Sequence, residues 1–332
     1  MLFSQDIAID LGTSKTRVYA YKKGIILSEP SVAAMDLRDD PPSVAAIGKD
    51  AADMLGRTPG SVQVKRPLSH GGIADYEMTA DMLKLLIRKA VGRSLFNRSR
   101  VILCIPSGLT EVERRAFHDA ARNAGAKEVS IINSSFAAAI GAELPVSKPQ
   151  GCMVANLGAG TCECSVIASG DVISGESVRI GGDDMDEDII AFLRRKYNLL
   201  IGSKTSETVK KNIGSALAYF GEKTMTVRGR GLDTGLPKSV EVSPEEIRGA
   251  ILDKVNRISY MICDALEKTP PELAADIMDN GIVLTGGLAN LKCFDRYLTK
   301  LTKIKVRTAK DADKAVINGA GLILDMKAAD RK

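Results

Sequence analysis

The chain contains 332 residues, a length that suggests two domains or one large bilobed domain. Hydrophobic residues make up 45% and charged residues 26%, as in ordinary globular proteins, so disorder of the whole chain is excluded. The net charge of +5 is too small to indicate a nucleic-acid partner. No apolar run reaches the roughly 18 residues that a membrane-spanning helix needs.

The N-terminal segment, Met1–Asp6, leads directly into a strand-like stretch, without the basic and apolar regions of a secretory signal. We therefore expect a cytoplasmic protein whose six cysteines are reduced. A zinc or disulfide role for Cys162 and Cys164 is the alternative.

The first half of the chain begins with three predicted strands. An apolar strand over Asp6–Asp10 ends in the turn Gly12-Thr13-Ser14, and returning strands follow over Thr16–Tyr21 and Gly24–Leu27. The next stretch, residues 34–74, is rich in Asp, Pro and Gly and predicts a small inserted subdomain.

Helices and strands then alternate. Apolar residues at helical spacing predict a helix over 79–91, and Arg100–Ile105 is a short apolar strand. A capping box at Thr110 and Glu113 opens a helix to about Ala124, and Val129–Ile132 is the next strand.

The second half repeats this order about 146 residues later. It begins with a strand over Cys152–Ala155, the turn Asn156–Thr161 and returning strands over Cys162–Ser169 and Val172–Val178. A second insert, residues 191–254, is expected to be mostly helical with a loop at 222–240. The remaining elements are a capped helix from Ser243 to about Glu267, a helix opened by Thr269–Glu272, a strand over Gly281–Leu284, the turn Thr285-Gly286-Gly287, a helix over about 290–302 and a strand over Ile304–Arg307.

Two α/β lobes of one topology, each with a glycine turn, follow from this duplication. Such turns expose backbone N–H groups that suit phosphate oxygens. A single glycine turn is more simply a tight hairpin. Two matched turns and a third at Gly286–Gly287 favour a nucleotide cleft.

The chain resembles the MreB family of bacterial actin homologues, within the superfamily of actin and heat-shock chaperone ATPases. The stretches that carry the resemblance are Ile9–Thr13, Glu29–Val32, Met54–Gly60, Ala137–Gly141, Gly182–Glu187, Tyr197–Gly202 and Leu284–Gly287. The resemblance implies an actin-like, bilobed α/β fold, in which duplicated ribonuclease-H-like lobes surround a nucleotide cleft. It also implies ATP and Mg²⁺ binding and polymerisation into paired protofilaments on the inner face of the cell membrane. Such filaments determine cell shape and guide the cell-wall elongation machinery.

The resemblance further implies four subdomains. The core of the first lobe (IA) would comprise residues 1–33, 75–150 and a C-terminal helix at about 318–332, with 34–74 as its small subdomain (IB). The core of the second lobe (IIA) would comprise 151–190 and 255–317, with 191–254 as its small subdomain (IIB).

Carried over position by position, the resemblance implies the contacts with the phosphates and the metal. The phosphate turns would be Gly12-Thr13-Ser14 and Gly158-Ala159-Gly160-Thr161. Asp10 would face a hydrated Mg²⁺ ion and contact it through water.

The nucleoside would lie against a second set of residues. This set comprises Gly182, Asp183, Gly286, Gly287 and Leu288, the last in place of a usual glycine. Glu207 and Lys210 would bracket the ribose and adenine. On spacing alone, these two residues are more simply a solvated ion pair on one helix face.

Two departures from the family pattern concern hydrolysis. Asn133-Ser134-Ser135 stands where the family usually has Glu-Glu-Pro, so Asn133 replaces the carboxylate that positions the attacking water. Asn156 replaces an Asp that holds the metal's water shell or orients the nucleophile. Losing a positioned base commonly costs about 10²–10⁴ in rate. We therefore expect ATP binding with slow or absent hydrolysis.

A membrane contact is expected at residues 92–100. The apolar pair Leu95 and Phe96 lies between arginines in this loop, and the resemblance implies that the pair inserts into the membrane. The simpler alternative is that both side chains pack onto the lobe.

A small-molecule kinase of the same superfamily is the main functional alternative. Such a kinase needs an Asp base, and the corresponding segment here, Asn133-Ser134-Ser135, contains no carboxylate. A chaperone ATPase would need a substrate-binding domain after the last predicted helix.

Overall fold

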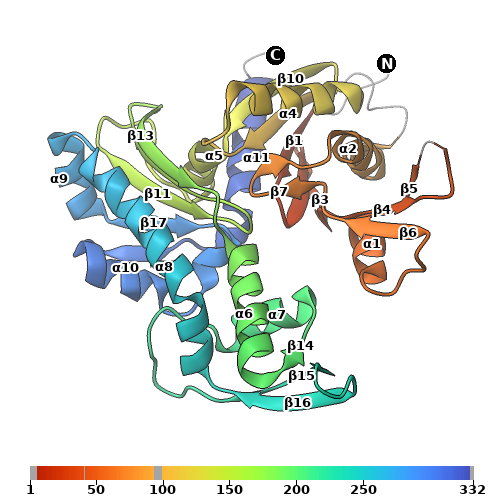
Figure 1. The fold of residues 1–332 in the computed structure, drawn as a ribbon. Helices are drawn as coiled ribbons and strands as arrows, with labels where there is room; N and C mark the ends of the chain where they lie inside the picture. The colour runs from red at the N-terminus through yellow and green to blue at the C-terminus, as the bar shows by residue number, and fades with distance from the viewer. Residues whose placement is uncertain (1–5, 41, 93–98, 330–332) are drawn as a thin grey trace. The chain divides into compact units, whose positions relative to one another are not determined.

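The computed structural model describes residues 6–40, 42–92 and 99–329. The chain divides into two compact units, which are described separately (Figure 1). Unit 1 comprises Met1–Val146 and Lys314–Lys332, and unit 2 comprises Ser147–Asp313. Among the described residues, no helix combines the length and apolar character needed to cross a membrane.

Unit 1 is built on a five-stranded sheet of order β10-β9-β1-β2-β3. Its strands are β1 (Ile7–Leu11), β2 (Lys15–Ala20), β3 (Gly24–Pro30), β9 (Arg100–Ile105) and β10 (Glu128–Asn133). The first three strands are antiparallel neighbours, whereas β9 and β10 run parallel to β1. Strand side chains alternate between faces, so Ile7 and Ile9 share one face with Leu11.

Helices cover this sheet. They are α2 (Tyr76–Val91), α4 (Glu111–Asn123), α5 (Ser134–Gly141) and α11 (Ala315–Ala329). The apolar stripe of α2, including Met82 and Leu86, packs with Phe117 of α4 against Ile7 and Ile9 in the unit's core. This confirms the predicted core-facing helix.

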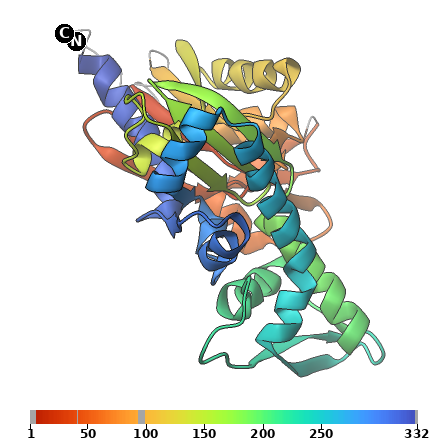
Figure 2. The same cartoon turned by 90° about the vertical axis from the view of Figure 1, so that its left-hand side faces the viewer.

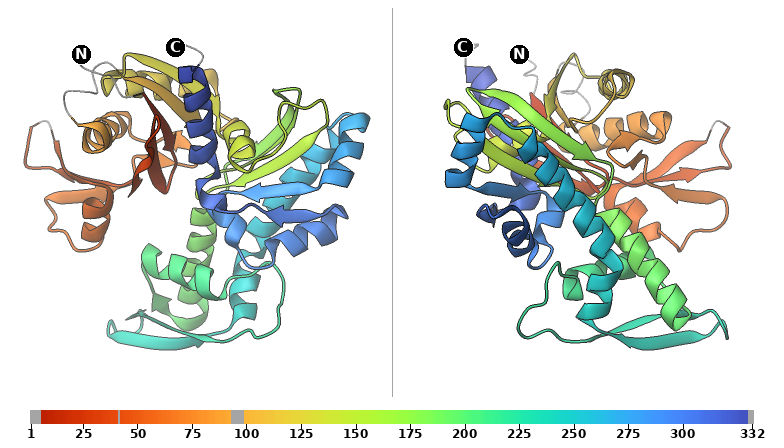
Figure 3. Two further views of the ribbon diagram at one scale, coloured as in Figure 1. Left: turned by 180° about the vertical axis from the view of Figure 1, so that it is seen from behind. Right: turned by 60° about the vertical axis from the view of Figure 1, so that its left-hand side comes forward.

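Helices α5 and α11 pack closely against each other, and α11 also contacts β1 and β2 (Figure 3). Glycines make the approach possible. A Cβ atom on Gly141 would lie 1.9 Å from the Ala315 carbonyl oxygen, and one on Gly319 would lie 1.8 Å from the Ala137 carbonyl oxygen. Each helix therefore presents a bare glycine to the backbone of the other.

The rest of unit 1 is a small sheet of order β5-β4-β6 with one helix, and a short hairpin. These elements are β4 (Ala33–Asp36), β5 (Ser43–Ile47), α1 (Gly48–Met54), β6 (Val62–Lys65), β7 (Leu68–Ser69) and β8 (Gly72–Ile73). Val32, Ala34 and Ala51 form a small apolar cluster between this sheet and α1.

Unit 2 repeats the main sheet of unit 1, with the order β13-β12-β11-β17-β18. Its strands are β11 (Cys152–Leu157), β12 (Cys162–Ala168), β13 (Asp171–Val178), β17 (Ile282–Thr285) and β18 (Val306–Thr308). β11 to β13 are antiparallel neighbours, and β17 and β18 run parallel to β11. The predicted duplication is therefore confirmed strand by strand.

The other elements of unit 2 include a long pair of neighbouring helices, α6 and α8 (Figure 2). The helices are α6 (Gly182–Tyr197), α7 (Ser203–Ile213), α8 (Pro244–Glu267), α9 (Pro271–Asn280) and α10 (Phe294–Thr302), with 3₁₀ turns at Gly287–Asn290 and Ala312–Lys314. A small sheet of order β14-β15-β16 consists of β14 (Leu199–Leu200), β15 (Met225–Gly231) and β16 (Pro237–Val242).

The prediction of a loop at 222–240 was wrong, because most of this segment is a β-hairpin. Strands β15 and β16 pair antiparallel, with Val227 opposite Val240. Buried residues such as Val227 and Val242 alternate with exposed polar ones. So few apolar residues face inward that the period of two was easily missed.

The predicted capping box of α8 is present, and its Glu246 carboxylate is also hydrogen-bonded to α6. Ser243 Oγ accepts a hydrogen bond from the Glu246 N–H (3.3 Å), and the Glu246 carboxylate accepts one from the Ser243 N–H (2.7 Å). Lys196 and the Tyr197 hydroxyl of α6 donate to the same carboxylate. Burial raises the pKa of Glu246, but the hydrogen bonds from Lys196, Ser243 and Tyr197 outweigh it and lower the pKa to about 2.

Glu246→Gln is expected to lower the free energy of unfolding by about 1 kcal/mol at neutral pH. Because the pKa is lowered in the folded state, the ionised carboxylate stabilises the protein above its unfolded pKa of about 4.3, and this contribution is lost as the pH falls toward 2. Urea unfolding of both proteins should therefore differ at pH 7 and converge only as the pH falls below about 2. A pH-independent difference would assign the effect to packing.

Candidate functional site

The two predicted phosphate turns have the same backbone geometry. In unit 1 the Gly12 N–H donates to the Lys15 carbonyl oxygen at 3.2 Å, and in unit 2 the Gly158 N–H donates to the Thr161 carbonyl oxygen at 2.8 Å. A Cβ atom on either glycine would crowd that same oxygen, at 2.9 Å and 2.7 Å. Each glycine is therefore required by the turn itself.

Side chains and backbone from neighbouring segments hold the first turn. The buried Ser31 hydroxyl donates to the Gly12 carbonyl oxygen (2.6 Å), and the Ser31 N–H donates to the Ser14 carbonyl oxygen (3.0 Å). Thr13 Oγ1 accepts from the Gly71 N–H at 3.2 Å. These contacts use residues that sequence analysis did not assign to the site. Ser31 lies within Glu29–Val32, one of the stretches that resemble the family, but the sequence does not show that its hydroxyl contacts Gly12.

Each turn is flanked by a pair of residues that face each other across two strands. In unit 1, Asp10 of β1 lies opposite Arg17 of β2, and in unit 2, Asn156 of β11 lies opposite Glu163 of β12. Arg17 Nη1 lies 3.4 Å from Asp10 Oδ2, and Asn156 Nδ2 donates to Glu163 Oε1 at 3.2 Å. The Thr285 hydroxyl lies 3.4 Å from Asn156 Oδ1. Equivalent positions thus carry a charge pair in one unit and an amide–carboxylate pair in the other.

Burial raises the pKa of Asp10 above its ordinary value, although Arg17 acts in the opposite direction. For a Mg²⁺ ion the arrangement offers few donors. Asp10 already has a cationic partner, and Asn156 carries no charge. Within the described ranges, no group of three or more His, Cys, Asp or Glu side chains could hold a metal ion.

Asn133 and Asp10 lie at the same end of the unit 1 sheet, where the parallel strands β1 and β10 have their C-terminal ends. Both β1 and β10 run parallel to β9, in which Cys104 is opposite Asp10 and Ile105 is opposite Asn133. Asn133 also caps α5. Its Oδ1 accepts from the Ser135 N–H (2.9 Å) and from the Ser135 hydroxyl (2.7 Å). The amide oxygen is thus committed to the helix, and the amide NH₂ can only donate.

In unit 2, the start of α6 is hydrogen-bonded to the second phosphate turn. The Gly182 N–H donates to the Gly158 carbonyl oxygen (3.1 Å), and the Asp183 N–H donates to the Ala159 carbonyl oxygen (2.8 Å). A Cβ atom on Gly181 would lie 2.3 Å from the latter oxygen. Gly182 and Asp183, which were assigned to the nucleoside, are therefore hydrogen-bonded to the second phosphate turn.

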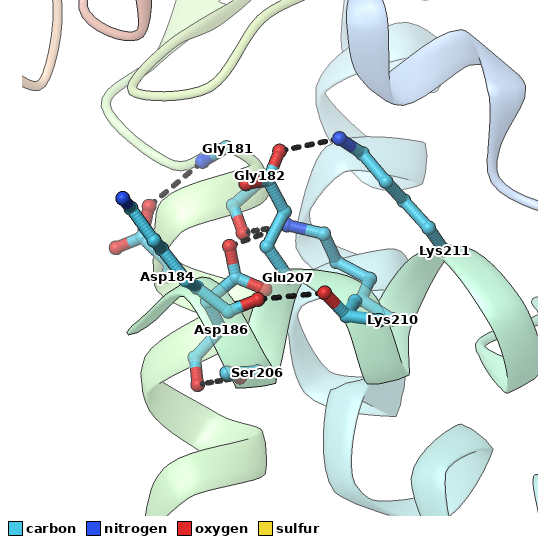
Figure 4. A network of polar contacts seen from close by, with 10 residues as sticks. Gly181, Gly182, Asp184, Asp186, Ser206, Glu207, Lys210 and Lys211 are labelled. Atoms are coloured by element: carbon cyan, nitrogen blue, oxygen red, sulfur yellow. Dashed lines mark hydrogen bonds and ion pairs between the residues drawn. The ribbon is translucent and has the colours of Figure 1, made fainter. Parts of the chain in front are cut away.

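Lys210 of α7 connects to this helix start (Figure 4). Its Nζ donates to the Gly182 carbonyl oxygen and lies 2.7 Å from Asp186 Oδ2. The Lys210 side chain is 10% exposed, so it is a buried cation and not half of a solvated pair. Glu207, by contrast, is partly exposed and pairs with Lys211 at 2.6 Å.

Asp186 was missed as a partner of Lys210, because the two residues come from different helices. The Asp186 carbonyl oxygen also accepts from the Ser206 hydroxyl (2.7 Å), which joins α6 to α7 (Figure 4). Burial raises the pKa of Asp186 to about 6, although Lys210 acts to lower it. Its Oδ1 is buried without a hydrogen-bond partner among the described residues.

The third glycine turn follows β17. Gly286 has φ of +83°, and a Cβ atom there would lie 2.3 Å from the Leu157 carbonyl oxygen, so this turn is fitted against the end of β11. A Cβ atom on Gly287, by contrast, would meet no described atom within 4 Å apart from its chain neighbours. Leu288 is buried. The space beside Gly287 is thus the part of this turn that a ligand could approach.

The predicted membrane contact cannot be located in the structure, because Leu95 and Phe96 lie outside the described residues.

All six cysteines are free, and burial raises the pKa of the Cys162 and Cys164 thiols far above the ordinary value. Neither thiol is poised to form a thiolate, so the alternative zinc or disulfide role has no support here.

Comparison with known proteins places these features in a family. Residues 4–332 match the family model of the MreB/Mbl protein. The chain is 46% identical over 328 residues to the cell shape-determining protein MreB of Escherichia coli K12, covering 98% of this chain and 94% of that protein. It is 38% identical over 324 residues to the cell shape-determining protein Mbl of Bacillus subtilis 168, covering 98% and 97%.

Solved structures of MreB proteins also match this chain. Spiroplasma citri MreB5 bound to ADP matches with a TM-score of 0.92 and 36% identity, over 100% of this chain and 99% of that one. A second MreB5 structure, bound to AMPPNP, also gives a TM-score of 0.92. The MamK double helical filament, at 17% identity and a TM-score of 0.81 over 97% of this chain and 98% of that one, supports the fold alone. The chain therefore belongs to the MreB/Mbl family and has the actin-like fold.

Proposed function

We propose that this protein is an ATP-binding cytoskeletal protein that polymerises into filaments and determines cell shape. The matched pair of glycine turns, in duplicated units of an MreB/Mbl chain, carries the proposal. Its relatives are named cell shape-determining proteins, and MreB5 is bound to ADP or AMPPNP in its structures. Family membership favours this function over a small-molecule kinase.

The glycine turns would supply the contacts with the nucleotide. The backbone of Gly12-Thr13-Ser14 and of Gly158-Ala159-Gly160-Thr161 would bind the phosphates. The open side of Gly287 and the partly exposed Glu207 would lie toward the nucleoside. Lys210 would act indirectly, by holding the start of α6 against the second phosphate turn. Mg²⁺ would be bound chiefly by the phosphates, and when bound it would neutralise their charge.

Hydrolysis is proposed to be slow. An attacking water must lose a proton, and the usual acceptor is a carboxylate. Asn133 instead directs its amide oxygen to Ser135, and Asn156 directs its NH₂ group to Glu163. Both amides are engaged within their own units and neither is a useful base.

The filaments are proposed to lie on the inner face of the cell membrane and to work with the cell-wall elongation machinery. Leu95 and Phe96 would insert, and nearby arginines would contact anionic lipids. One inserted apolar side chain contributes at most about 1.5–3 kcal/mol, and each nearby arginine about 1 kcal/mol. A single subunit would bind weakly, so polymerisation would strengthen binding by repeating the contact.

Co-sedimentation tests this function. With ATP, the protein should pellet as filaments, and anionic liposomes should increase the pelleted fraction. Leu95→Ser with Phe96→Ser should remove the effect of the liposomes while leaving ATP-dependent pelleting intact. A protein that stays in the supernatant with ATP at concentrations at which a filament-forming MreB relative pellets would refute the proposal.

Gly287→Val is expected to weaken ATP and ADP binding by about 10-fold or more, because the added side chain occupies the space that the ligand approaches. The fold should tolerate it better than a change at Gly158 or Gly286, where protein backbone blocks a Cβ atom. Nucleotide affinity is measured by titration, with the melting temperature without nucleotide as control. Unchanged affinity would exclude this turn from the binding site.

A further inference from the structure

The first phosphate turn is flanked by a buried cation. Asp10 lies two residues before Gly12, and Arg17 follows the turn on the returning strand. Their side chains are 15% and 9% exposed, and the guanidinium nitrogen lies 3.4 Å from the carboxylate. At the equivalent positions of unit 2, Asn156 faces Glu163, an amide and a carboxylate. The duplication has therefore placed a cation at this cross-strand position beside one turn only.

The fold does not require this charge pair. The next cross-strand pair on the same face of the sheet, Ala8 and Tyr19, carries no charge. Replacing a buried ion pair by apolar residues is often neutral or stabilising, because both charges must be removed from water. The presence of Arg17 is therefore better explained by ligand binding at the turn than by the stability of the sheet.

The metal site expected from the family does not fit this chain well. Mg²⁺ prefers oxygen ligands, usually one or two carboxylates together with substrate phosphates. The carboxylate at this turn, Asp10, is already paired with Arg17, and its counterpart in unit 2 is the uncharged Asn156. The charge that would attract a metal is balanced within the protein.

We propose that Arg17 is the resident cation of the first phosphate turn and makes nucleotide binding depend only weakly on Mg²⁺. The inference rests on the proposed nucleotide-binding function. Without Arg17, the Asp10 carboxylate would repel the phosphates unless a metal ion lay between them. With Arg17, that repulsion is already balanced, and the guanidinium adds attraction for the anionic ligand.

Nucleotide titrations in excess Mg²⁺ and in EDTA test this proposal. For the wild-type protein, EDTA should weaken ATP binding by less than about 10-fold, whereas for Arg17→Leu it should weaken binding by about 100-fold or more. Arg17→Lys keeps the charge and should resemble the wild type. In the absence of nucleotide, Mg²⁺ should raise the melting temperature of Arg17→Leu more than that of the wild type.

If EDTA weakens ATP binding by the same factor for the wild type and for Arg17→Leu, the proposal is overturned. If Arg17→Leu does not fold, Asp10→Asn replaces it, because this variant leaves Arg17 unopposed and should bind ATP more tightly in EDTA than the wild type does. Equal or weaker binding by Asp10→Asn in EDTA would also overturn the proposal. Failure of the wild type to bind ATP even with Mg²⁺ would instead refute the nucleotide-binding function, and the role of Arg17 with it.

Discussion

Gly319→Ala is expected to lower the free energy of unfolding by about 3 kcal/mol or more. The added methyl group would lie 1.8 Å from the Ala137 carbonyl oxygen and 2.8 Å from the Gly141 nitrogen, both of which are backbone atoms of α5. No side-chain rotation can relieve such an overlap. Helices α5 and α11 must move apart, and α11 also contacts β1 and β2 of the same sheet. Overpacking usually costs about 1–3 kcal/mol, and backbone overlap belongs at the upper end.

Gly249→Ala is the matched control. Gly249 lies in α8, and a Cβ atom there would meet no described atom within 4 Å beyond its own helix, so alanine should stabilise the helix by about 0.5–1 kcal/mol. Urea unfolding of the two variants should therefore shift in opposite directions. Gly141→Ala with Gly319→Ala should cost less than the sum of the single changes, because one separation of the helices relieves both overlaps. A Gly319→Ala variant as stable as the wild type would show that α5 and α11 are not in close contact.

The main sheets and the capped helices could be predicted because their signals are local. The glycine turns after Asp10 and Asn156 mark strand ends, and their repetition indicated one topology used twice. The capping boxes at Thr110 and Ser243 are formed as expected. Such features depend on residues a few positions apart, which a sequence displays directly.

Other features depend on contacts or backbone states that the sequence does not display. The helix expected from about 290 begins at Phe294, because a 3₁₀ turn over Gly287–Asn290 and a left-handed Cys293 come first. Thr269 was expected to open α9, but its hydroxyl donates to the Ala265 carbonyl oxygen of α8. Both differences are choices between competing local hydrogen bonds.

The candidate site was incomplete for a related reason. Arg17 and Asp186 act through partners on other elements, and neither belongs to a glycine turn or a catalytic motif. The register of β1 with β2 identifies the partner of Arg17, and the packing of α6 on α7 identifies that of Asp186. Residues chosen by motif alone therefore included Asp10 and Lys210 but not the charges that balance them.

Asn133→Glu with Asn156→Asp is expected to accelerate ATP hydrolysis by about 10-fold or more, a part of the roughly 10²–10⁴ that a positioned base commonly contributes. Recovery should be incomplete, because each amide has a structural partner. The longer glutamate side chain at position 133 cannot cap α5 as Asn133 does through Ser135, at a cost of about 1 kcal/mol. An aspartate at position 156 would place a second carboxylate close to that of Glu163, where Asn156 now donates a hydrogen bond.

These partners set the controls for the hydrolysis experiment. Adding Glu163→Gln to the double variant removes the carboxylate repulsion and should restore stability, whereas adding it to the wild type should leave hydrolysis slow. The measurement is single-turnover phosphate release at saturating ATP, beside an MreB relative that carries Glu and Asp at these two positions. The wild-type protein should release phosphate far more slowly than that relative, because its two amides are committed to Ser135 and Glu163 and accept protons poorly. Equal rates would show that water attacks without help from a carboxylate at either position, and the proposal of a weakened ATPase would be wrong.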